Sequence, residues 1–346
     1  MVEFGSDFQY IEPVGRVSGT LFDLYPCANY YADGRHPLIH LCQSQKWERL
    51  WVPEYFCYDV VETLKQAGVT VQFYTDWPAR PGDNTNLDSL VREGIIRPQD
   101  ALLKVNYFGL RSYQDPGFYP VAAIIEDHTH DLIGDWASHS DADWCIASLR
   151  KSLPIPEGGI LWSPKGYRLP DSPPQLEEND SIAAIRWKAM KFKTEYLAGK
   201  SVDKTLFRSG FVNTEEFFDR VPICSLDKDS FEYLSRFDVH DWYTKKRENW
   251  NLLRAIEKEG ISVMCPDGHG CYPFSVIVLF NSESERNRVR KALIDRRVYP
   301  AILWVVPSDS NDNVYSFSSR MLSIHCDGRY TSEDILQMKT IIESVL

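Results

Sequence analysis

This sequence of 346 residues has neither long apolar runs nor an excess of basic residues. No window reaches the roughly 18 uninterrupted apolar residues of a membrane-spanning helix, and the amino terminus lacks the basic and apolar segments of a secretory signal. Acidic residues outnumber basic ones 49 to 38, which gives a formal net charge of −11. Because nucleic acids and anionic membranes repel such a chain on average, we expect neither as a partner.

Closely spaced cysteine frameworks are also absent. The eight cysteines are spread singly through apolar surroundings, which is typical of a reduced chain, so we expect a cytoplasmic location. Cys265 and Cys271 flank His269 in the segment CPDGHGC, a combination that suggests zinc. Since a fourth ligand with matching spacing is missing, we favour a turn between two strands and predict no metal site.

The pattern of apolar residues predicts an α/β fold. Between residues 37 and 161, short apolar runs alternate with helix-length amphipathic segments. Strands that are apolar on both faces belong to a mostly parallel central sheet with helices on both faces. The runs that we assign to such strands end at or before residues 53, 74, 109, 127 and 151. Ligands of parallel sheets bind at the carboxyl ends of the strands, so the polar residues there are candidates for a site.

The length favours two domains. We predict an amino-terminal arm at 1–26, a large domain at 27–235 and a smaller carboxyl-terminal α/β domain at 236–346. Within the large domain, segments 163–181 and 200–235 are interpreted as loops, with a helix at about 182–199 between them. The small domain is expected to contain, in order, a helix at 236–259, a strand at 272–280, a helix at 283–296, two strands and a last helix at 332–345. Thr331 and Asp334 have the spacing of a capping box at the start of that last helix.

Four polar residues close two neighbouring apolar runs. Asp127 ends one run, His130 follows three residues later, and Ser148 and Lys151 end the next run. Taken singly, such an aspartate is more often a turn residue and such a lysine a solvated charge. In this order, however, they supply what a pyridoxal phosphate site needs: a carboxylate for the ring nitrogen, a lysine for a Schiff base and a hydroxyl for the phosphate.

With these residues the chain resembles the DegT/DnrJ/StrS-type (sugar) aminotransferases, which are fold-type I enzymes dependent on pyridoxal 5'-phosphate. The resemblance covers most of the length and depends on the segments NYYADGRHPLIHLC, LWVPEYFCYDVVETLKQAGVTVQFY, VNYFG, IIEDHTH, SLRK, EGG and KKRENWNLL. It implies a large domain that binds the cofactor, a smaller carboxyl-terminal domain, and a homodimer.

The resemblance also implies roles for single residues. Lys151 would form the Schiff base and later move the proton between substrate and cofactor, and Asp127 would pair with the pyridinium nitrogen. His130 stands where the family usually has glutamine, and it would donate to the phenolic oxygen of the ring. Asn106 is a second candidate for that oxygen or for a supporting contact.

The phosphate and the ring face have candidates of the same kind. Ser148 and the backbone amides of Gly34, Arg35 and His36, at a helix start, would hold the phosphate. The Arg35 side chain would either contact the phosphate or pack nearby, and both alternatives stay open. Tyr55 or Phe56 would cover the ring, with Phe56 preferred. The family's Gly-x-Asn-x-Arg segment, which reaches the neighbouring subunit's phosphate, is not visible between 200 and 235.

We therefore expect an aminotransferase whose partners are small molecules. It would move an amino group from an amino acid donor, plausibly glutamate, to a keto acceptor such as a keto-sugar in amino-sugar or cell-surface polysaccharide biosynthesis. Two alternatives remain: elimination or racemisation with the same cofactor, and a non-catalytic ligand-binding protein on the same fold. Cys57 is interpreted as a packed thiol, and His128 and Asp131 as turn or cap residues. The basic run 245–247 is interpreted as a solvated helix face, with one of its residues as a candidate to turn toward the substrate.

Overall fold

The computed structural model describes residues 3–13, 19–78, 85–113, 119–218, 220, 222–256 and 258–346. Residues 1–2 and 14–18 of the predicted amino-terminal arm therefore lie outside the described residues, as do residues 219 and 221 of segment 200–235 and residue 257 of the predicted helix 236–259.

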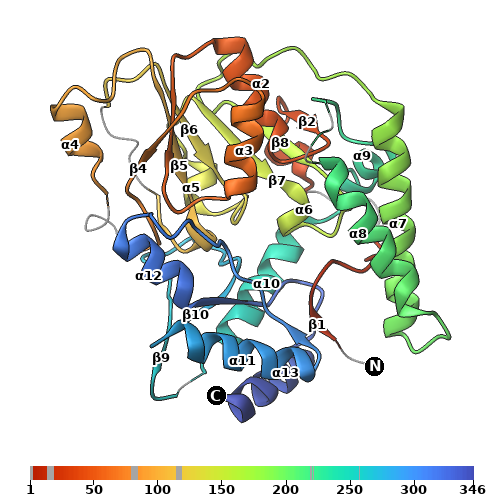
Figure 1. Cartoon of the computed structure of the whole chain (residues 1–346). Helices are drawn as coiled ribbons and strands as arrows, with labels where there is room; N and C mark the ends of the chain where they lie inside the picture. Colours follow the sequence, from red (N-terminus) through yellow and green to blue (C-terminus); the bar gives the residue numbers. More distant parts are fainter. Residues whose placement is uncertain are drawn as a thin grey trace.

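A seven-stranded sheet in the order β2-β8-β7-β6-β5-β3-β4 forms the upper part of the molecule (Figure 1). The strands are β2 (Asn29–Tyr31), β3 (Leu50–Pro53), β4 (Val71–Tyr74), β5 (Ala101–Val105), β6 (Ala123–Asp127), β7 (Trp144–Ser148) and β8 (Gly159–Trp162). The strands from β4 to β7 are parallel, whereas β8 is antiparallel to both β7 and β2. The prediction of a mostly parallel sheet is confirmed.

Both faces of this sheet are buried, as the uninterrupted apolar runs predicted. Along β6, Ile125 packs in one core cluster with side chains of α2 (His36–Gln45) and α3 (Tyr58–Gln66). Its neighbour Ile124 points to the other face and packs in a cluster with Trp187 and Phe207. Shorter helices connect the strands: α1 (Leu21–Leu24), α4 (Leu87–Arg92), η1 (Tyr107–Gly109), α5 (Asp135–Ser138) and α6 (Leu149–Ser152).

Three helices cover that second face, and here the sequence-based boundaries need correction. They are α7 (Glu177–Leu197), α8 (Lys204–Phe218) and α9 (Lys228–Leu234). The first begins five residues before the predicted start, because its acidic first turn favours a helix amino terminus. Segment 200–235 is mostly helical rather than a loop. Its buried Phe207, Phe211 and Phe218 follow helical spacing along α8.

The lower part of the molecule contains a three-stranded antiparallel sheet in the order β12-β10-β9 (Figure 1). Its strands are β9 (Ile261–Val263), β10 (Ser275–Phe280) and β12 (Met321–His325), and its helices are α10 (Val239–Leu253), α11 (Glu283–Asp295), α12 (Asp312–Arg320) and α13 (Ser332–Val345). The bounds of α13 match the prediction, and its Thr331–Asp334 capping box is present. α10 is shorter than predicted, and α12 was not predicted.

The first described residues join this lower part. β1 (Phe4–Gly5) pairs in parallel with β11 (Val298–Tyr299), and Phe4 belongs to the same core cluster as side chains of β10 and β12. The predicted boundary at residue 235 falls between α9 and α10, and the division into domains stays a prediction. Among the described residues, none of the helices combines the length and hydropathy of a membrane span.

Candidate active site

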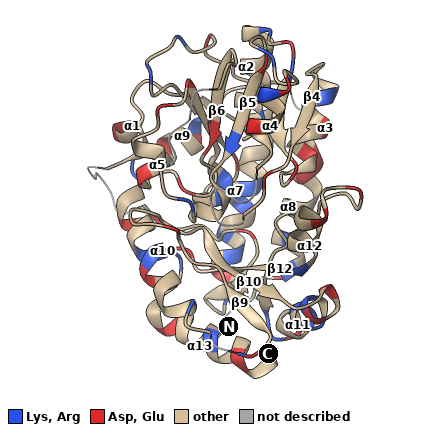
Figure 2. Cartoon of the chain, turned by 90° about the vertical axis from the view of Figure 1, so that its left-hand side faces the viewer, with Lys and Arg blue, Asp and Glu red and all other residues tan. Residues whose placement is uncertain are grey.

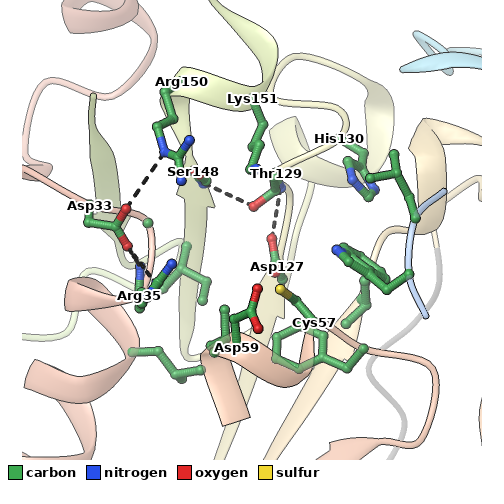
Figure 3. A pocket seen from close by; sticks show the side chains of 18 of the residues that line it. Asp33, Arg35, Cys57, Asp59, Asp127, Thr129, His130, Ser148, Arg150 and Lys151 are labelled. Carbon is green, nitrogen blue, oxygen red and sulfur yellow. Dashed lines mark hydrogen bonds and ion pairs between the residues drawn. The ribbon is translucent and has the colours of Figure 1, made fainter. Parts of the chain in front are cut away.

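A cavity lies at the carboxyl ends of β6 and β7 (Figure 3). Its walls contain most of the side chains that the sequence singled out: Gly34, Arg35, Phe56, Asp127, His130, Ser148 and Lys151. The neighbouring parallel strands β6 and β7 bring Asp127 and Ser148 to one edge of the sheet. The expected grouping of these residues is therefore present in the fold.

Lys151 enters the cavity from α6, which begins directly after Ser148. Figure 3 shows the side chains of Lys151 and Asp127 pointing into the same space. The positive charge of Arg150 lowers the pKa of Lys151 to about 8, and desolvation within the cavity adds to this effect. A larger fraction of the Lys151 amine is therefore neutral, and able to attack a carbonyl, than in an ordinary lysine.

Among the described residues, Asp127 is a carboxylate without a lysine or arginine partner. One of its oxygens accepts a hydrogen bond from the backbone N–H of Thr129 at 2.8 Å. No lysine or arginine in the described ranges forms an ion pair with it, and burial raises the pKa of Asp127. A protonated ring nitrogen placed beside it would supply the missing positive charge.

Thr129 is a residue that the sequence analysis missed. The backbone N–H of Ser148 donates to its hydroxyl at 2.9 Å, so Thr129 ties the end of β6 to the end of β7. Its side chain lines the cavity between Asp127 and His130. Its position within the Asp-x-x-His segment could have identified it.

His130 is buried and fixed by its neighbours. The backbone N–H of Phe108 donates to His130 Nδ1 at 3.0 Å, so the ring proton is on Nε2. Burial, followed by the charges of Lys246 and Lys151, lowers the pKa of His130 to about 3. The ring stacks on Trp304 at 5.4 Å between centroids. His130 is therefore a neutral hydrogen-bond donor.

The turn before α2 fits tightly against the ends of β7 and β8. A Cβ atom on Gly34 would lie 2.4 Å from Ser148 Cβ, and one on Gly159 would lie 2.4 Å from the carbonyl oxygen of Asp33. Only glycine permits this approach at either position. The backbone at Gly34 consequently meets Ser148 at one end of the cavity, where the sequence predicted a phosphate site.

Asp33 occupies part of the expected phosphate site. Its side chain accepts from the backbone N–H of Arg35 at 2.9 Å, and its carbonyl accepts from that of His36 at 3.2 Å. Two of the three amides that were expected to hold a phosphate are thus engaged within the turn. The Arg35 guanidinium also faces this carboxylate, at 3.2 Å.

Arg150 and Glu215 extend the ion pairs, and neither was predicted. Arg150 lies 3.7 Å from Asp33 and donates to Glu215 at 2.8 Å (Figure 3 shows the first pair). Burial opposes ionisation of Glu215, but the charges of Arg150 and Arg186 together lower its pKa to about 2. Glu215 lies on α8, and no local signal in the sequence predicts where α8 packs.

Aromatic side chains close the opposite wall. Phe56 is 2% exposed and lines the cavity together with Trp304 and Phe274. Tyr55 lies outside the lining, because successive residues of this turn point apart and its hydroxyl donates to the carbonyl of Leu303. Of the two aromatic candidates, only Phe56 borders the cavity.

Two other candidates also lie away from the cavity lining. Asn106 is buried and contacts His128 Nδ1 at 3.4 Å, and His36 is buried at the start of α2. Cys57 does line the cavity, and burial raises the pKa of its thiol. Asp131 caps its own turn by accepting from the backbone N–H of Gly134, as expected.

The interpretation of residues 245–247 as a solvated face is wrong for Lys246. Lys245 is exposed, but Lys246 is 1% exposed, and its ammonium lies 3.4 Å from the carbonyl of His130 and 4.2 Å from the centroid of the Tyr243 ring. Burial lowers its pKa to about 8. This lysine supports the loop that carries His130.

One group of three candidate metal ligands occurs among the described residues: Glu126, His128 and Cys145. Glu126 already pairs with His128 at 3.1 Å and accepts from Ser140 at 2.6 Å. Within the described residues, the CPDGHGC segment contributes to no such group. It connects the antiparallel strands β9 and β10, as predicted.

No family model and no curated protein matches the chain. Similar solved structures do occur. PseC of Helicobacter pylori, an aminotransferase involved in the biosynthesis of pseudoaminic acid, is 11% identical over 99% of each chain, with a TM-score of 0.61. The PLP form of the sugar aminotransferase candidate Spr1654 of Streptococcus pneumoniae is 12% identical, over 94% of this chain and 89% of that one, with a TM-score of 0.59.

A DegT/DnrJ/EryC1/StrS aminotransferase of Brucella abortus is 14% identical, over 92% of this chain and 85% of its own, with a TM-score of 0.58. These similarities extend over nearly the whole chain. The chain therefore has the fold of the DegT/DnrJ/EryC1/StrS aminotransferases.

Proposed function

We propose that the cavity binds pyridoxal 5'-phosphate and that the protein is an aminotransferase. The observation that carries this proposal is that two complementary groups border one cavity. Lys151 is an amine of lowered pKa, and Asp127 is a carboxylate that forms no ion pair with a lysine or arginine of the described residues. The tight approach of Gly34 to Ser148 and the neutral donor His130 fit the same group.

The cofactor would supply an aldehyde that joins to amines and a ring that withdraws electrons from the attached carbon. Asp127 would hold a proton on the ring nitrogen, and His130 Nε2–H would donate to the phenolic oxygen. Phe56 and Thr129 would pack against the ring. Ser148, the Gly34 amide and the Arg35 guanidinium would hold the phosphate, while the amides of Arg35 and His36 keep the turn in shape.

Lys151 would act twice. Its neutral amine would attach the cofactor. After an amino donor has displaced it, the free amine would take the α-proton of the donor and return it to the cofactor carbon that carries the nitrogen, so that water would release the donor as a keto acid and its amino group would stay on the cofactor. The same steps in reverse on a keto acceptor would complete a ping-pong cycle. We propose glutamate as the donor. We propose a keto-sugar as the acceptor class, which agrees with the sugar aminotransferase candidate among the similar structures.

We further propose a homodimer and a cytoplasmic location. Exposed apolar side chains on α7 and α8, among them Ile185, Leu206 and Val212, support an interface on this side of the molecule. All eight cysteines are free thiols, which supports a reducing compartment. Light scattering coupled to gel filtration would measure the mass in solution.

The decisive experiment uses borohydride reduction. The purified protein is incubated with pyridoxal 5'-phosphate, and we expect a visible absorption band and, after reduction, a covalent adduct that peptide mass spectrometry locates on Lys151. Lys151→Ala should lose both signals. Lys245→Ala, at an exposed lysine, should keep them. A protein that stays colourless, or an adduct on another lysine only, would contradict the proposal.

Donor screening then separates the alternatives. Loss of the band on addition of an amino acid, with release of the matching keto acid, supports amino transfer. Release of an elimination product or inversion of the donor without keto acid would support the other cofactor chemistries. A stable band that no donor changes would support a ligand-binding protein.

A further inference from the structure

Thr129 contacts all three elements that carry the main site residues. It lies two residues beyond Asp127, just after the end of β6, and its side chain lines the cavity. Hydrogen bonds join it to Asp127, to Ser148 at the end of β7 and to Ser152 of α6. The same short helix carries Lys151. The function proposed above uses Thr129 only to pack against the ring, so its polar contacts have no role there.

The hydroxyl oxygen of Thr129 is a hydrogen-bond acceptor. The backbone N–H of Ser148 donates to Oγ1 at 2.9 Å, across the ends of the adjacent parallel strands β6 and β7. A hydroxyl that accepts one hydrogen bond keeps its own O–H for donation. Accepting a bond also polarises the O–H and strengthens it as a donor. Thr129 can therefore donate to an oxygen on its other side.

The carboxylate of Asp127 is on that side. One of its oxygens accepts from the backbone N–H of Thr129 at 2.8 Å (Figure 3). Desolvation raises the pKa of Asp127, whereas hydrogen bonds from the hydroxyl and from the backbone N–H of Thr129 lower it. Both donors of Thr129 thus favour the ionised carboxylate and fix its direction. An ionised carboxylate is what a protonated ring nitrogen needs beside it.

The backbone of Thr129 is held from the opposite direction. The hydroxyl of Ser152 donates to the Thr129 carbonyl, and the Ser152 carbonyl accepts from the indole Nε1–H of Trp242 on α10 at 2.9 Å. Ser152 and Trp242 are both buried. Because these contacts fix the backbone, the Thr129 hydroxyl keeps a constant place between Ser148 and Asp127.

We propose that Thr129 is a positioning residue for the reaction, whose hydroxyl links the backbone of Ser148 to the carboxylate of Asp127 and holds both as the cofactor requires. This inference rests on the proposed function, because Asp127 and Ser148 act there on the ring nitrogen and on the phosphate. It predicts that loss of one hydroxyl group weakens both ends of the cofactor site together.

A titration with pyridoxal 5'-phosphate labelled with nitrogen-15 in its ring tests the proposal. Thr129→Val replaces the hydroxyl with a methyl group of similar size and keeps the backbone contacts. We expect its Kd for the cofactor, measured by absorbance, to rise about tenfold or more, because the Ser148 N–H loses its acceptor and Asp127 loses a donor. We also expect the ring-nitrogen NMR signal of the bound cofactor to move away from the position of a protonated nitrogen.

Three further variants complete the set. Thr129→Ser keeps the hydroxyl and should retain most of the affinity and the signal of the protonated nitrogen. Thr340→Val makes the matched exchange at an exposed residue of α13, at the opposite end of the molecule from β6 (Figure 2), and should change neither. Where Thr129→Val does not fold, Thr129→Ala also lacks the hydroxyl and is measured with the same expectation.

A purely structural role of Thr129 would give a different result. In that case Thr129→Val would lower the melting temperature, but its bound cofactor would keep the unaltered Kd and ring-nitrogen signal. Equal losses in Thr129→Val and Thr129→Ser would assign the effect to packing rather than to the hydroxyl. Either result would overturn the proposal.

The outcomes also distinguish this inference from the proposed function. If the unaltered protein forms no absorption band with the cofactor, the proposed function has failed. If the band forms and Thr129→Val matches the unaltered protein in Kd and ring-nitrogen signal, the role of Thr129 is wrong while the cofactor site stands. If the bound ring nitrogen of the unaltered protein carries no proton, the roles of Asp127 and Thr129 are both wrong, although the adduct on Lys151 would remain.

Discussion

The reactivity of Lys151 depends on the residue beside it. Because the Arg150 charge lowers the pKa of Lys151 to about 8, the fraction of neutral amine rises as the pH passes 8 rather than 10.5. We expect the rate of adduct formation with pyridoxal 5'-phosphate to rise with the same midpoint. Arg150→Met should move the midpoint upward and slow the reaction at pH 7 about tenfold for each unit of pKa gained. Stopped-flow absorbance measures this, with Arg168→Met as control. An unmoved midpoint would refute the role of Arg150.

His130 gives a second test at the level of one residue. Its Nδ1 accepts from a backbone N–H, and burial lowers its pKa to about 3, so the ring should stay neutral with its proton on Nε2 between pH 5 and 9. Nitrogen-15 NMR of the imidazole distinguishes the two tautomers and the charged form. The His130→Gln spectrum assigns the signals. A ring that titrates in this range would show that the contact with Phe108 is not kept in solution.

The sequence identified some site residues and missed others for physical reasons. Asp127, Ser148 and Lys151 close adjacent strands, so their order along the chain already brings them together. Glu215 comes from α8, and only tertiary packing brings it to the cavity. Lys246 was misjudged because charged residues on a helix are usually solvated. One step along α10 turns the side chain by about 100°, from solvent at Lys245 into the protein.

Among the elements, the close contact between the start of β8 and the turn before α2 leads to a prediction about stability and cofactor binding. A Cβ on Gly159 would lie 2.4 Å from the Asp33 carbonyl, and this backbone atom cannot move without shifting α2. We expect Gly159→Ala to lower the free energy of unfolding by about 1–3 kcal/mol and to weaken cofactor binding.

Thermal unfolding and a cofactor titration measure these two effects. Ser172→Ala, at an exposed loop residue, is the control and should change neither. Normal cofactor affinity in Gly159→Ala would mean that the turn tolerates the shift and does not shape the phosphate end.

Element boundaries were predictable where a local signal exists. Thr331 and Asp334 mark the start of α13, and the structure has this capping box. α8 carries a regular spacing of buried phenylalanines, but the segment was interpreted as a loop because the family's motif is missing there. The start of α7 was placed too late, since its acidic residues were assigned to the preceding loop.

At the scale of the whole molecule, the first described strand packs against the lower sheet. Phe4 is 2% exposed, its ring lies 5.7 Å from that of Tyr330, and the Gly5 N–H donates to the Tyr330 hydroxyl at 2.6 Å. Phe4→Ala should lower the free energy of unfolding by about 3–5 kcal/mol, because it leaves a buried void.

Denaturant unfolding measures this loss. Leu336→Ala is the matched control, since Leu336 is 51% exposed on α13 and its truncation should cost less than about 0.5 kcal/mol. Equal effects of the two substitutions would show that the amino-terminal strand adds little to stability.

Trp304 lies between β11 and α12, where its ring stacks on His130 and borders the cavity with Phe56. An indole in that place is a built-in fluorophore. A conjugated ring that absorbs near its emission would accept its excitation energy at this short range and quench it. Occupancy of the cavity can thus be followed by intrinsic tryptophan fluorescence. The part of the quenching that is lost in Trp304→Phe reports on this wall alone.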